Sequence, residues 1–587
     1  MTNVKMLLAT LTSALLVASA TAVPPPATSG PAPDSTTAPA AVARDPQLSI
    51  FGVGSSSMRD GNHPQWMPQM AAIGIRDVRA FYGSWGIERE EGQFDFTKFD
   101  ARLSYDESLG VQAGVLFNGT PPWKRGQEKG LPMHSLAEWS AMVKETVKHT
   151  KGRIKLFECW NEAPNGTAKD QTGADYAKLL CATYDAAKEA NPEAMVGMAA
   201  KSAHITYLDQ ALVAGAKGHY DYITLHPYEV LGCVVNHPGT EQVYLSIVPN
   251  VRKMLKARDP AKANVPVIFT EIGVDTRRGN DKQAQAVLKT YIMGIHQGVA
   301  CINYYEGMDG DSGPLGLLDN HAEPRPAYHA LGRLIDKVSR HPTSLGWVML
   351  NDKHYGFMIQ GAKGPVLATW TTTTAPDEVN FGPEVEILDP TTGASTKATK
   401  YNLTLAPVLV LNVPAKLVAQ AKLNKGKPMP WGGDYSNAKS VSVTFTDKYE
   451  EKGLHTMAAD SIAADVLAYG GNARSGEVPK GGNVFYVDPN FLSYDTVPLE
   501  ITAMVKRNEK GEKISLGFEY ETSKTAREGY QRVEPQEIPE DSSEWHKLTW
   551  KIDDCQFIGT WAFHFRIQAD AKKYRMQSLT VTRLDRP

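Results

Sequence analysis

Short apolar runs alternate with amphipathic stretches from residue 48 to residue 339. The amphipathic stretches repeat their apolar residues with helical spacing, whereas the runs between them are typical of buried strands. Strands that alternate with helices form parallel sheets, and eight such units in roughly 290 residues fit a closed (β/α)8 TIM barrel. The predicted strands are 48–54, 75–82, 111–117, 154–162, 194–200, 220–227, 265–271 and 300–305, and the clearest helices are 135–149, 175–190 and 282–297.

Two of these strands lead into a glutamate that lies close to a chain breaker. The fourth leads to Glu162, shortly before Pro164, and the seventh to Glu271, shortly before Gly273. A breaker marks the point where a strand ends. Because the functional residues of such barrels lie at the carboxyl ends of the strands, we expect the two carboxylates to face each other across the barrel mouth.

Other polar and aromatic side chains are predicted at the same end of the barrel. Arg79, late in the second strand, is expected to keep Glu271 ionised, to neutralise the interior Glu158, or to do both. Aromatic residues at the barrel mouth, such as Trp85 and Tyr304, either stack on a ligand or pack the core. The remaining candidates for substrate binding are Asn161, His226, Tyr228, Trp160, Trp123, Tyr305 and Glu306.

A pair of carboxylates at a barrel mouth suits the hydrolysis of a glycosidic bond. One carboxylic acid protonates the leaving oxygen, and the second, ionised carboxylate acts on the opposite side of the sugar. Carboxyl groups about 5–5.5 Å apart lead to a covalent intermediate and retention, whereas about 6.5–9.5 Å leaves room for a water and leads to inversion. The sequence leaves both outcomes open.

With these motifs the chain resembles the clan A retaining glycoside hydrolases. Trp-Asn-Glu-Ala-Pro at 160–164 and Thr-Glu at 270–271 look like their paired catalytic signature. Phe-Glu-Cys-Trp at 157–160 and Thr-Pro-Pro-Trp at 120–123 are most similar to family 39, and His-Pro-Tyr at 226–228 matches a His-x-Tyr element of family 5. The resemblance covers roughly residues 48–340 and implies an α/β barrel.

The resemblance also implies a role for each residue. Glu162 would be the acid/base and Glu271 the nucleophile; Asn161 would bind the sugar 2-hydroxyl, and Tyr228 and Arg79 would hold Glu271, with His226 nearby. Independently, burial of Glu162 beside Trp160 is expected to raise its pKa, as an acid requires. Two departures are Ala163, which separates the glutamate from the proline, and tyrosines 304 and 305 where the family often has tryptophan.

The predicted function is therefore that of a secreted retaining glycoside hydrolase that cleaves β-linked oligo- or polysaccharides without a metal or other cofactor. The alternative is a non-catalytic carbohydrate-binding protein on a decayed barrel. A barrel metallohydrolase using His204, His226 and His237 is a weaker hypothesis, because no His-x-His follows the first strand.

The N-terminal segment is typical of a secretory signal. Lys5, an apolar stretch at 6–17 and small residues up to Ala22 predict a signal peptide at 1–22, and a Pro/Ala/Thr-rich linker follows at 23–45. We therefore expect a secreted or periplasmic protein with no membrane insertion after cleavage. The formal net charge of −3 over 587 residues gives no electrostatic reason to bind nucleic acid.

The pattern changes after the predicted barrel domain, 46–340. Short strands without helices predict a small all-β domain at 341–418, a Lys- and Pro-containing link at 419–430, and a jelly-roll-like β-sandwich at 431–587. The sandwich is either a carbohydrate-binding module or a structural cap. Its candidate stacking residues are Trp431, Tyr435, Tyr520, Tyr530 and Trp561.

Overall fold

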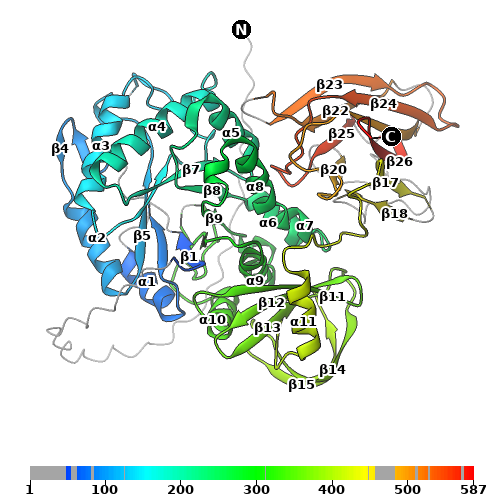
Figure 1. Cartoon of the computed structure of the whole chain (residues 1–587), viewed down its shortest axis with the longest axis horizontal. Helices are drawn as coiled ribbons and strands as arrows, with labels where there is room; N and C mark the ends of the chain where they lie inside the picture. The colour runs from blue at the N-terminus through cyan, green and yellow to red at the C-terminus, as the bar shows by residue number, and fades with distance from the viewer. Residues whose placement is uncertain are drawn as a thin grey trace, which may run out of the picture. The chain divides into compact units, whose positions relative to one another are not determined.

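The computed structural model describes residues 48–54, 62–80, 85–124, 126–310, 312–446, 449–456, 483–508, 513–525, 529–569 and 574–586. Its first part is a closed barrel of parallel strands in the order β1-β2-β5-β6-β7-β8-β9-β10, which closes by pairing β10 with β1 (Figure 1). All eight predicted strands are present, so the predicted TIM barrel is confirmed. The strands are β1 (Phe51–Gly54), β2 (Asp77–Ala80), β5 (Gln112–Phe117), β6 (Leu156–Cys159), β7 (Met195–Lys201), β8 (Tyr222–His226), β9 (Val267–Ile272) and β10 (Cys301–Tyr304).

Helices surround the barrel and connect its strands. The helix α4 begins with a capping box between Thr172 and Asp175, and α9 ends at Gly298, whose φ of 76° suits a glycine. Each helix buries one apolar face against the strands. The helices are α1 (His63–Ala72), α2 (Thr97–Ser108), α3 (Leu136–His149), α4 (Gly173–Ala190), α5 (Ile205–Ala211), α6 (Tyr228–Asn236), α7 (Glu241–Leu245), α8 (Ile247–Arg258), α9 (Asn280–Gln297) and α10 (Pro326–Val338).

A small hairpin of β3 (Glu88–Glu90) and β4 (Gln93–Phe94) lies between β2 and α2, and the sequence patterns did not predict it. Inside the barrel, below the charged residues of the mouth, lies a cavity of about 300 Å³. Small residues such as Ala113, Gly114 and Cys301 line it together with Arg79 and Glu158. The interior of this barrel is therefore less completely filled than is usual for the fold.

A six-stranded sheet follows the barrel, in the order β11-β12-β13-β16-β14-β15. One of its faces shares the buried cluster of the barrel through Phe357, Trp370 and Leu409, and β11 and β12 contact α9. Its other face has a core of its own, which includes Val379 and Phe381. The strands are β11 (Thr343–Leu350), β12 (His354–Gly361), β13 (Gly364–Thr369), β14 (Asp377–Leu388), β15 (Ser395–Leu403) and β16 (Val408–Leu411).

The predicted link at 419–430 is wrong in its first half. The helix α11 (Ala415–Asn424) occupies it and packs against β11. Ala421 is its fully buried residue, and the Cβ position of Gly346 would collide with the Ala421 carbonyl, so a glycine is needed for this close approach. A helix with so few buried side chains has a weak apolar period, which explains why the pattern did not reveal it.

The C-terminal region is a β-sandwich, as predicted. One sheet has the order β18-β17-β26-β21-β24 and the other β19-β20-β25-β22-β23. Apolar side chains between the two sheets form a separate core around Phe485, Phe518 and Trp550. The strands are β17 (Ser440–Phe445), β18 (Tyr449–Lys452), β19 (Leu454–Thr456), β20 (Asn483–Val487), β21 (Leu499–Arg507), β22 (Ser515–Glu521), β23 (Tyr530–Glu537), β24 (His546–Ile552), β25 (Phe565–Ala569) and β26 (Tyr574–Arg583).

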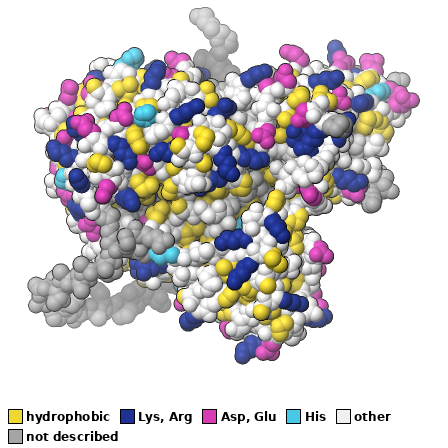
Figure 2. Space-filling model, viewed as in Figure 1, with side chains coloured by type: hydrophobic (Ala, Val, Ile, Leu, Met, Phe, Trp, Pro, Cys, Tyr) yellow, Lys and Arg dark blue, Asp and Glu magenta, His cyan; other side chains and the backbone are white. Residues whose placement is uncertain are grey.

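The predicted signal peptide and linker, residues 1–45, lie outside the described residues. Of the helices in the described part, none combines the length and the apolar character needed to cross a membrane. On the face shown in Figure 2, basic and acidic side chains are interspersed over the barrel and the β-sheets, as the small net charge leads one to expect.

Candidate active site

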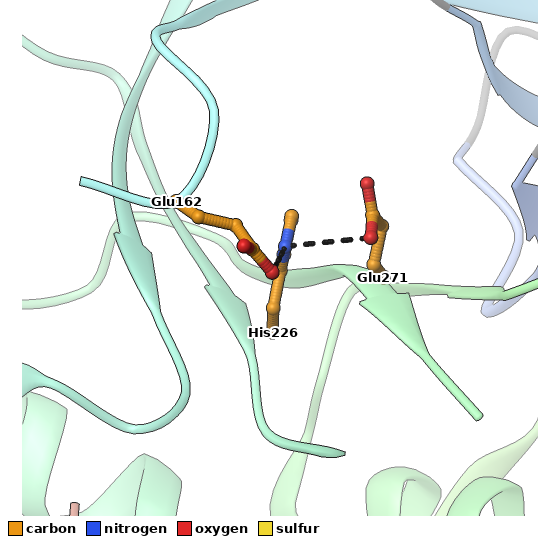
Figure 3. A group of neighbouring side chains, drawn as sticks. All are labelled: Glu162, His226 and Glu271. Atoms are coloured by element: carbon orange, nitrogen blue, oxygen red, sulfur yellow. Dashed lines mark hydrogen bonds and ion pairs between the residues drawn. The ribbon is translucent and has the colours of Figure 1, made fainter. Parts of the chain in front are cut away.

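The two predicted glutamates lie together at the carboxyl end of the barrel. Glu271 is inside β9 and has a 10 % exposed side chain, whereas Glu162 lies three residues beyond the end of β6 and has a 23 % exposed side chain. Figure 3 shows the two carboxylates on either side of the His226 ring. The fold therefore brings together two carboxylates that are 109 residues apart in the chain.

Glu271 is held by two donors. Arg79 donates from Nη1 to its Oε1, and the Tyr228 hydroxyl donates to its Oε2 at 2.9 Å. Burial, together with the adjacent charge of Glu271, raises the pKa of Tyr228 well above its ordinary value. The phenol therefore stays protonated and continues to donate. A guanidinium and a phenol thus bind the two oxygens of one carboxylate and fix its orientation.

Arg79 donates hydrogen bonds to both Glu158 and Glu271, the two partners that the sequence suggested for it. Its Nε donates to Glu158 Oε2 at 2.7 Å, and its Nη2 donates to Asn161 Oδ1 at 2.8 Å. The side chain is 4 % exposed, so burial alone would lower its pKa, but Glu158 and Glu271 outweigh that and raise it. The two alternatives for Arg79 are thus both realised in one buried network.

Two threonines complete this network beneath the mouth. Thr224 and Thr270 donate to Glu158 Oε1 at 2.7 and 2.9 Å. Glu158 thus receives bonds from three side chains and is 2 % exposed, which fits a structural counter-ion in the barrel interior. The sequence patterns did not single out either threonine, although Thr270 stands next to Glu271 and Thr224 points to the same side of its strand as His226.

His226 contacts Glu162 more closely than Glu271. Its Nδ1 lies 2.9 Å from Glu162 Oε1 and 3.7 Å from Glu271 Oε2, and its Nε2 lies 2.9 Å from Thr270 Oγ1. The imidazole is 1 % exposed, so the network fixes its orientation. The resemblance implied only that this histidine would be near Glu271, and the structure places it between the two carboxylates.

The expected rise in the pKa of Glu162 is not found. Burial would raise this pKa, but the hydrogen bond and charge of His226, the hydrogen bond from Asn165 and the charge of Arg79 together lower it to about 2. The Asn165 amide donates to Glu162 Oε2 at 3.0 Å. The sequence argument considered burial beside Trp160 and could not include the two donors that the fold supplies.

The loop that carries Glu162 has an unusual backbone. Trp160 and Glu162 both have positive φ angles, 69° and 54°, which side chains other than glycine seldom adopt. The Trp160 indole donates to the Asn165 carbonyl at 2.9 Å, and the ring packs on Gly166. Backbone strain of this kind concentrates at functional sites. Trp160, 3 % exposed, thus supports the loop around Glu162.

The remaining predicted site residues differ in burial and in their distance from the two carboxylates. Trp123 is half-buried and packs edge-on against Trp85 with ring centres 5.4 Å apart. The Tyr305 ring lies 6.5 Å from that of Tyr228, beside the carboxylates, whereas Tyr304 is fully buried. Glu306 is 1 % exposed and accepts a bond from the Gly310 amide within its own loop. Their burial favours structural roles for Tyr304 and Glu306.

Two adjoining hollows lie on the Glu162 side of the mouth. One, of about 610 Å³, includes Trp85, Arg89 and Pro122; the other, of about 290 Å³, includes Trp160 and Asn165. Both are lined by residues 118–120. Their linings mix aromatic, amide and charged side chains.

Glu162, His226 and Glu271 are also the one group among the described residues whose side chains have the spacing of metal ligands, with ligand atoms within 4.8 Å of one another. Neither His204 nor His237 belongs to it. Arg79 already places a positive charge on Glu271, and a second cation beside it would be repelled. The group is therefore a poor match for a divalent cation.

No protein-family model matches this chain, and no curated protein matches it. Several solved structures match it in fold. A family 39 glycoside hydrolase from the gut symbiont Bacteroides cellulosilyticus WH2 matches with 17% sequence identity and a TM-score of 0.53, over 62% of this chain and 81% of that one. At this identity the likeness concerns the fold.

Two further structures are less similar. A family 30 subfamily 8 xylanase from Clostridium acetobutylicum has 15% identity and a TM-score of 0.45, over 63% of this chain and 97% of that one. A GH5_18 protein from Streptomyces cattleya, in complex with GlcNAc, has 17% identity and a TM-score of 0.41, over 50% and 80%. The family 39 structure, which has the highest TM-score of the three, belongs to one of the two families to which the sequence showed a resemblance.

Proposed function

We propose that this protein is a glycoside hydrolase that cleaves β-linked oligo- or polysaccharides with retention, through a covalent intermediate on Glu271. The observation that carries the proposal is the carboxylate pair at the barrel mouth, in which one oxygen of each carboxylate lies within 4.8 Å of one oxygen of the other. So close an approach supports the short carboxyl separation of double-displacement enzymes over the longer one of inverting enzymes. The fold shared with a family 39 enzyme supports it.

Glu271 suits the role of nucleophile. Arg79 and Tyr228 bind its two oxygens and fix its orientation. The same donors can release it as its charge is consumed in the bond to the anomeric carbon. Asn161, held by Arg79 through its carbonyl oxygen, would bind the 2-hydroxyl of the reacting sugar, as the resemblance implies.

Glu162 requires a proton before it can act as the acid. In the free site its pKa is low because His226 binds it. Nδ1 of His226 lies 2.9 Å from Glu162 Oε1, so a proton can pass between the two groups. We assign His226 the role of proton relay for Glu162 on the basis of this contact.

The two hollows beyond Glu162 would then accept the leaving-group side of the substrate, because the acid lies next to the departing oxygen. Aromatic side chains such as Trp85 can pack on sugar rings there. Secretion remains a prediction from the N-terminal sequence, and the sandwich remains a candidate carbohydrate-binding module. Trp431 and Tyr520, two of its suggested stacking residues, are buried.

The test is a panel of β-linked polysaccharides and aryl glycosides, with NMR of the first-formed product. We expect turnover and a product with the anomeric configuration of the substrate. An inverted product would contradict the role of Glu271 as nucleophile. Binding without turnover by any member of the panel would favour the alternative of a carbohydrate-binding protein on a decayed barrel.

A further inference from the structure

The sandwich contacts the barrel close to the carboxylate pair through the loop 556–562, which joins β24 to β25. Ile558 and Ala562 belong to the same buried cluster as the barrel core. Asn250 of α8 donates to the Ile558 carbonyl at 3.1 Å, and Thr206 of α5 donates to the Gln556 side chain at 3.0 Å. The loop is therefore packed and hydrogen-bonded against two elements of the barrel.

Within the sandwich, a single buried carboxylate holds this loop in shape. The backbone amides of Ile558, Gly559 and Thr560 all donate to Glu521, at 2.8, 2.7 and 2.7 Å. Glu521 is 0 % exposed and lies at the end of β22. Three amides directed at one carboxylate fix the backbone of the loop, so its contacts with the barrel are rigid rather than adaptable.

The loop contacts the end of β7. The Ser202 hydroxyl donates to the Thr560 carbonyl, and the Lys201 ammonium lies 4.8 Å from the centre of the Trp561 ring. Ser202 is 2 % exposed and has a positive φ of 47°. A non-glycine residue in this conformation needs support from its surroundings, and the loop supplies it.

The end of β7 in turn is bonded to His226 and to the residue that follows Glu162. The His226 amide donates to the Ser202 carbonyl at 3.2 Å, and the Lys201 amide donates to the carbonyl of Ala163, the neighbour of Glu162, at 3.0 Å. His226 then bonds Glu162 through its ring. One continuous set of hydrogen bonds thus leads from Glu521 to Glu162.

We propose that the loop 556–562 of the sandwich, through Ser202, positions Glu162 and His226 for proton transfer, so that the sandwich is part of the catalytic unit. The inference rests on the proposed function, and Ser202 acts as a positioning residue because it touches neither carboxylate. Its loss should harm the step in which Glu162 donates a proton and spare the rest of the reaction.

This positioning role is tested by measuring how kcat/KM depends on the leaving group of the substrate. Ser202→Ala removes the hydroxyl that bonds the Thr560 carbonyl and the Glu229 side chain, and leaves the backbone bonds in place. With a saccharide or alkyl leaving group, which needs protonation, we expect kcat/KM to fall about tenfold, whereas a dinitrophenyl glycoside of the same sugar, which needs none, should show less than a twofold change. Trp561→Ala should shift the ratio of the two in the same direction.

The matched control is Lys253→Ala. Lys253 donates to Ser493 in the sandwich at 2.6 Å, so this variant also loses a bond between sandwich and barrel but lies outside the chain that leads to Glu162. It should leave the ratio between the two substrates unchanged. Equal losses on both substrates in Ser202→Ala, or no loss on either, would overturn the inference.

Hydrogen exchange measured by mass spectrometry gives a readout that needs no turnover. Ser202→Ala should speed exchange in the peptides that contain the amides of Lys201 and His226, and Lys253→Ala should not. Unchanged exchange in Ser202→Ala would contradict the inference. If the wild type cleaves no glycoside, the proposed function fails, and this exchange measurement alone decides whether the loop braces the end of β7.

Discussion

Glu162 and Glu271 have the same side chain but different neighbours, and the roles proposed for them follow from those neighbours. Arg79 and Tyr228 bind Glu271, whereas His226 and Asn165 bind Glu162. A nucleophile must stay ionised, and an acid must be able to receive a proton from a nearby donor. The neighbours of Glu271 suit a nucleophile and those of Glu162 suit an acid, although both residues follow similar apolar runs in the sequence.

Replacement of each glutamate separates these roles. Glu162→Ala should lose about 10²- to 10⁴-fold in rate on substrates with poor leaving groups and keep activity on activated ones, where added azide should yield a glycosyl azide of retained configuration. Glu271→Ala should lack the intermediate and form only the opposite anomer with azide. Product NMR measures both, and exchanged outcomes for the two variants would reverse the assignment.

Tyr228 offers a finer test of the nucleophile. Tyr228→Phe removes the 2.9 Å bond to Glu271 and keeps the ring. A hydrogen bond to a charged group contributes about 1.5–3 kcal/mol, so kcat should fall roughly 10- to 100-fold. The control is Tyr304→Phe, whose hydroxyl bonds the Val274 backbone. A similar loss of activity in the control would show that Tyr228 acts only through packing.

Among the helices and strands, a buried ion pair between two barrel helices accepts a hydrogen bond from the six-stranded sheet. Lys289 of α9 donates to Glu241 of α7 at 3.1 Å, and the Trp370 indole, just after β13, donates to the same oxygen at 2.8 Å. The two charged side chains are 2 % and 0 % exposed. Removal of one partner from such a pair leaves a buried charge uncompensated.

Glu241→Gln should therefore destabilise the protein by about 3–5 kcal/mol, measured as a loss of unfolding free energy in urea. Combination with Lys289→Met, which removes the remaining charge, should restore part of that loss. Glu378→Gln, which breaks the exposed pair with Lys400 on the same sheet, should leave stability unchanged. If Glu241→Gln is as stable as the wild type, the buried pair between α7 and α9 does not contribute to stability.

At the scale of the whole molecule, the barrel and the sandwich share one buried cluster through Tyr486, Tyr494, Ile558 and Ala562. The apolar contact is reinforced by polar ones, such as the bond from the Tyr494 hydroxyl to Asp209, which Arg258 also binds. An appended module that served only to bind carbohydrate would not need such an extensive buried contact. The sandwich contributes to the stability of the barrel.

Glu521 predicts how this stability depends on pH. Burial raises its pKa from 4.5 to about 7, against the opposing effect of the three loop amides. Because this folded-state pKa lies above the unfolded value, its favourable contribution is complete below pH 4.5 and is lost as the pH rises towards 7, by about 3 kcal/mol. Above pH 7 the contribution no longer changes.

The measurement compares urea unfolding of the wild type and Glu521→Gln from pH 5 to pH 8. Glutamine cannot ionise, so the stability of the wild type relative to the variant should fall with rising pH and level off near pH 8. A difference that is constant across this range would show that Glu521 keeps an ordinary pKa in the folded protein.

The sequence by itself determined the barrel and the location of its glutamates, because strand and helix periods and chain breakers are local properties of the chain. It also revealed the sandwich, since most of its strands alternate apolar and polar residues. It missed the edge strands β15, β18, β19 and β23. In β15, β18 and β23 most side chains are polar and exposed or half-buried, so they lack an apolar alternation, and β19 is only three residues long. The helix α11 was missed for the same kind of reason.

Only the tertiary structure decided the electrostatics of the site and the contacts between its parts. The sequence suggested a raised pKa for Glu162, and the fold lowers it by placing His226 and Asn165 on its oxygens. The sequence left Arg79 with two alternatives, and the fold satisfies both. A pKa and a domain contact depend on groups that are distant in the chain and meet only when it folds, so no local pattern in the sequence contains them.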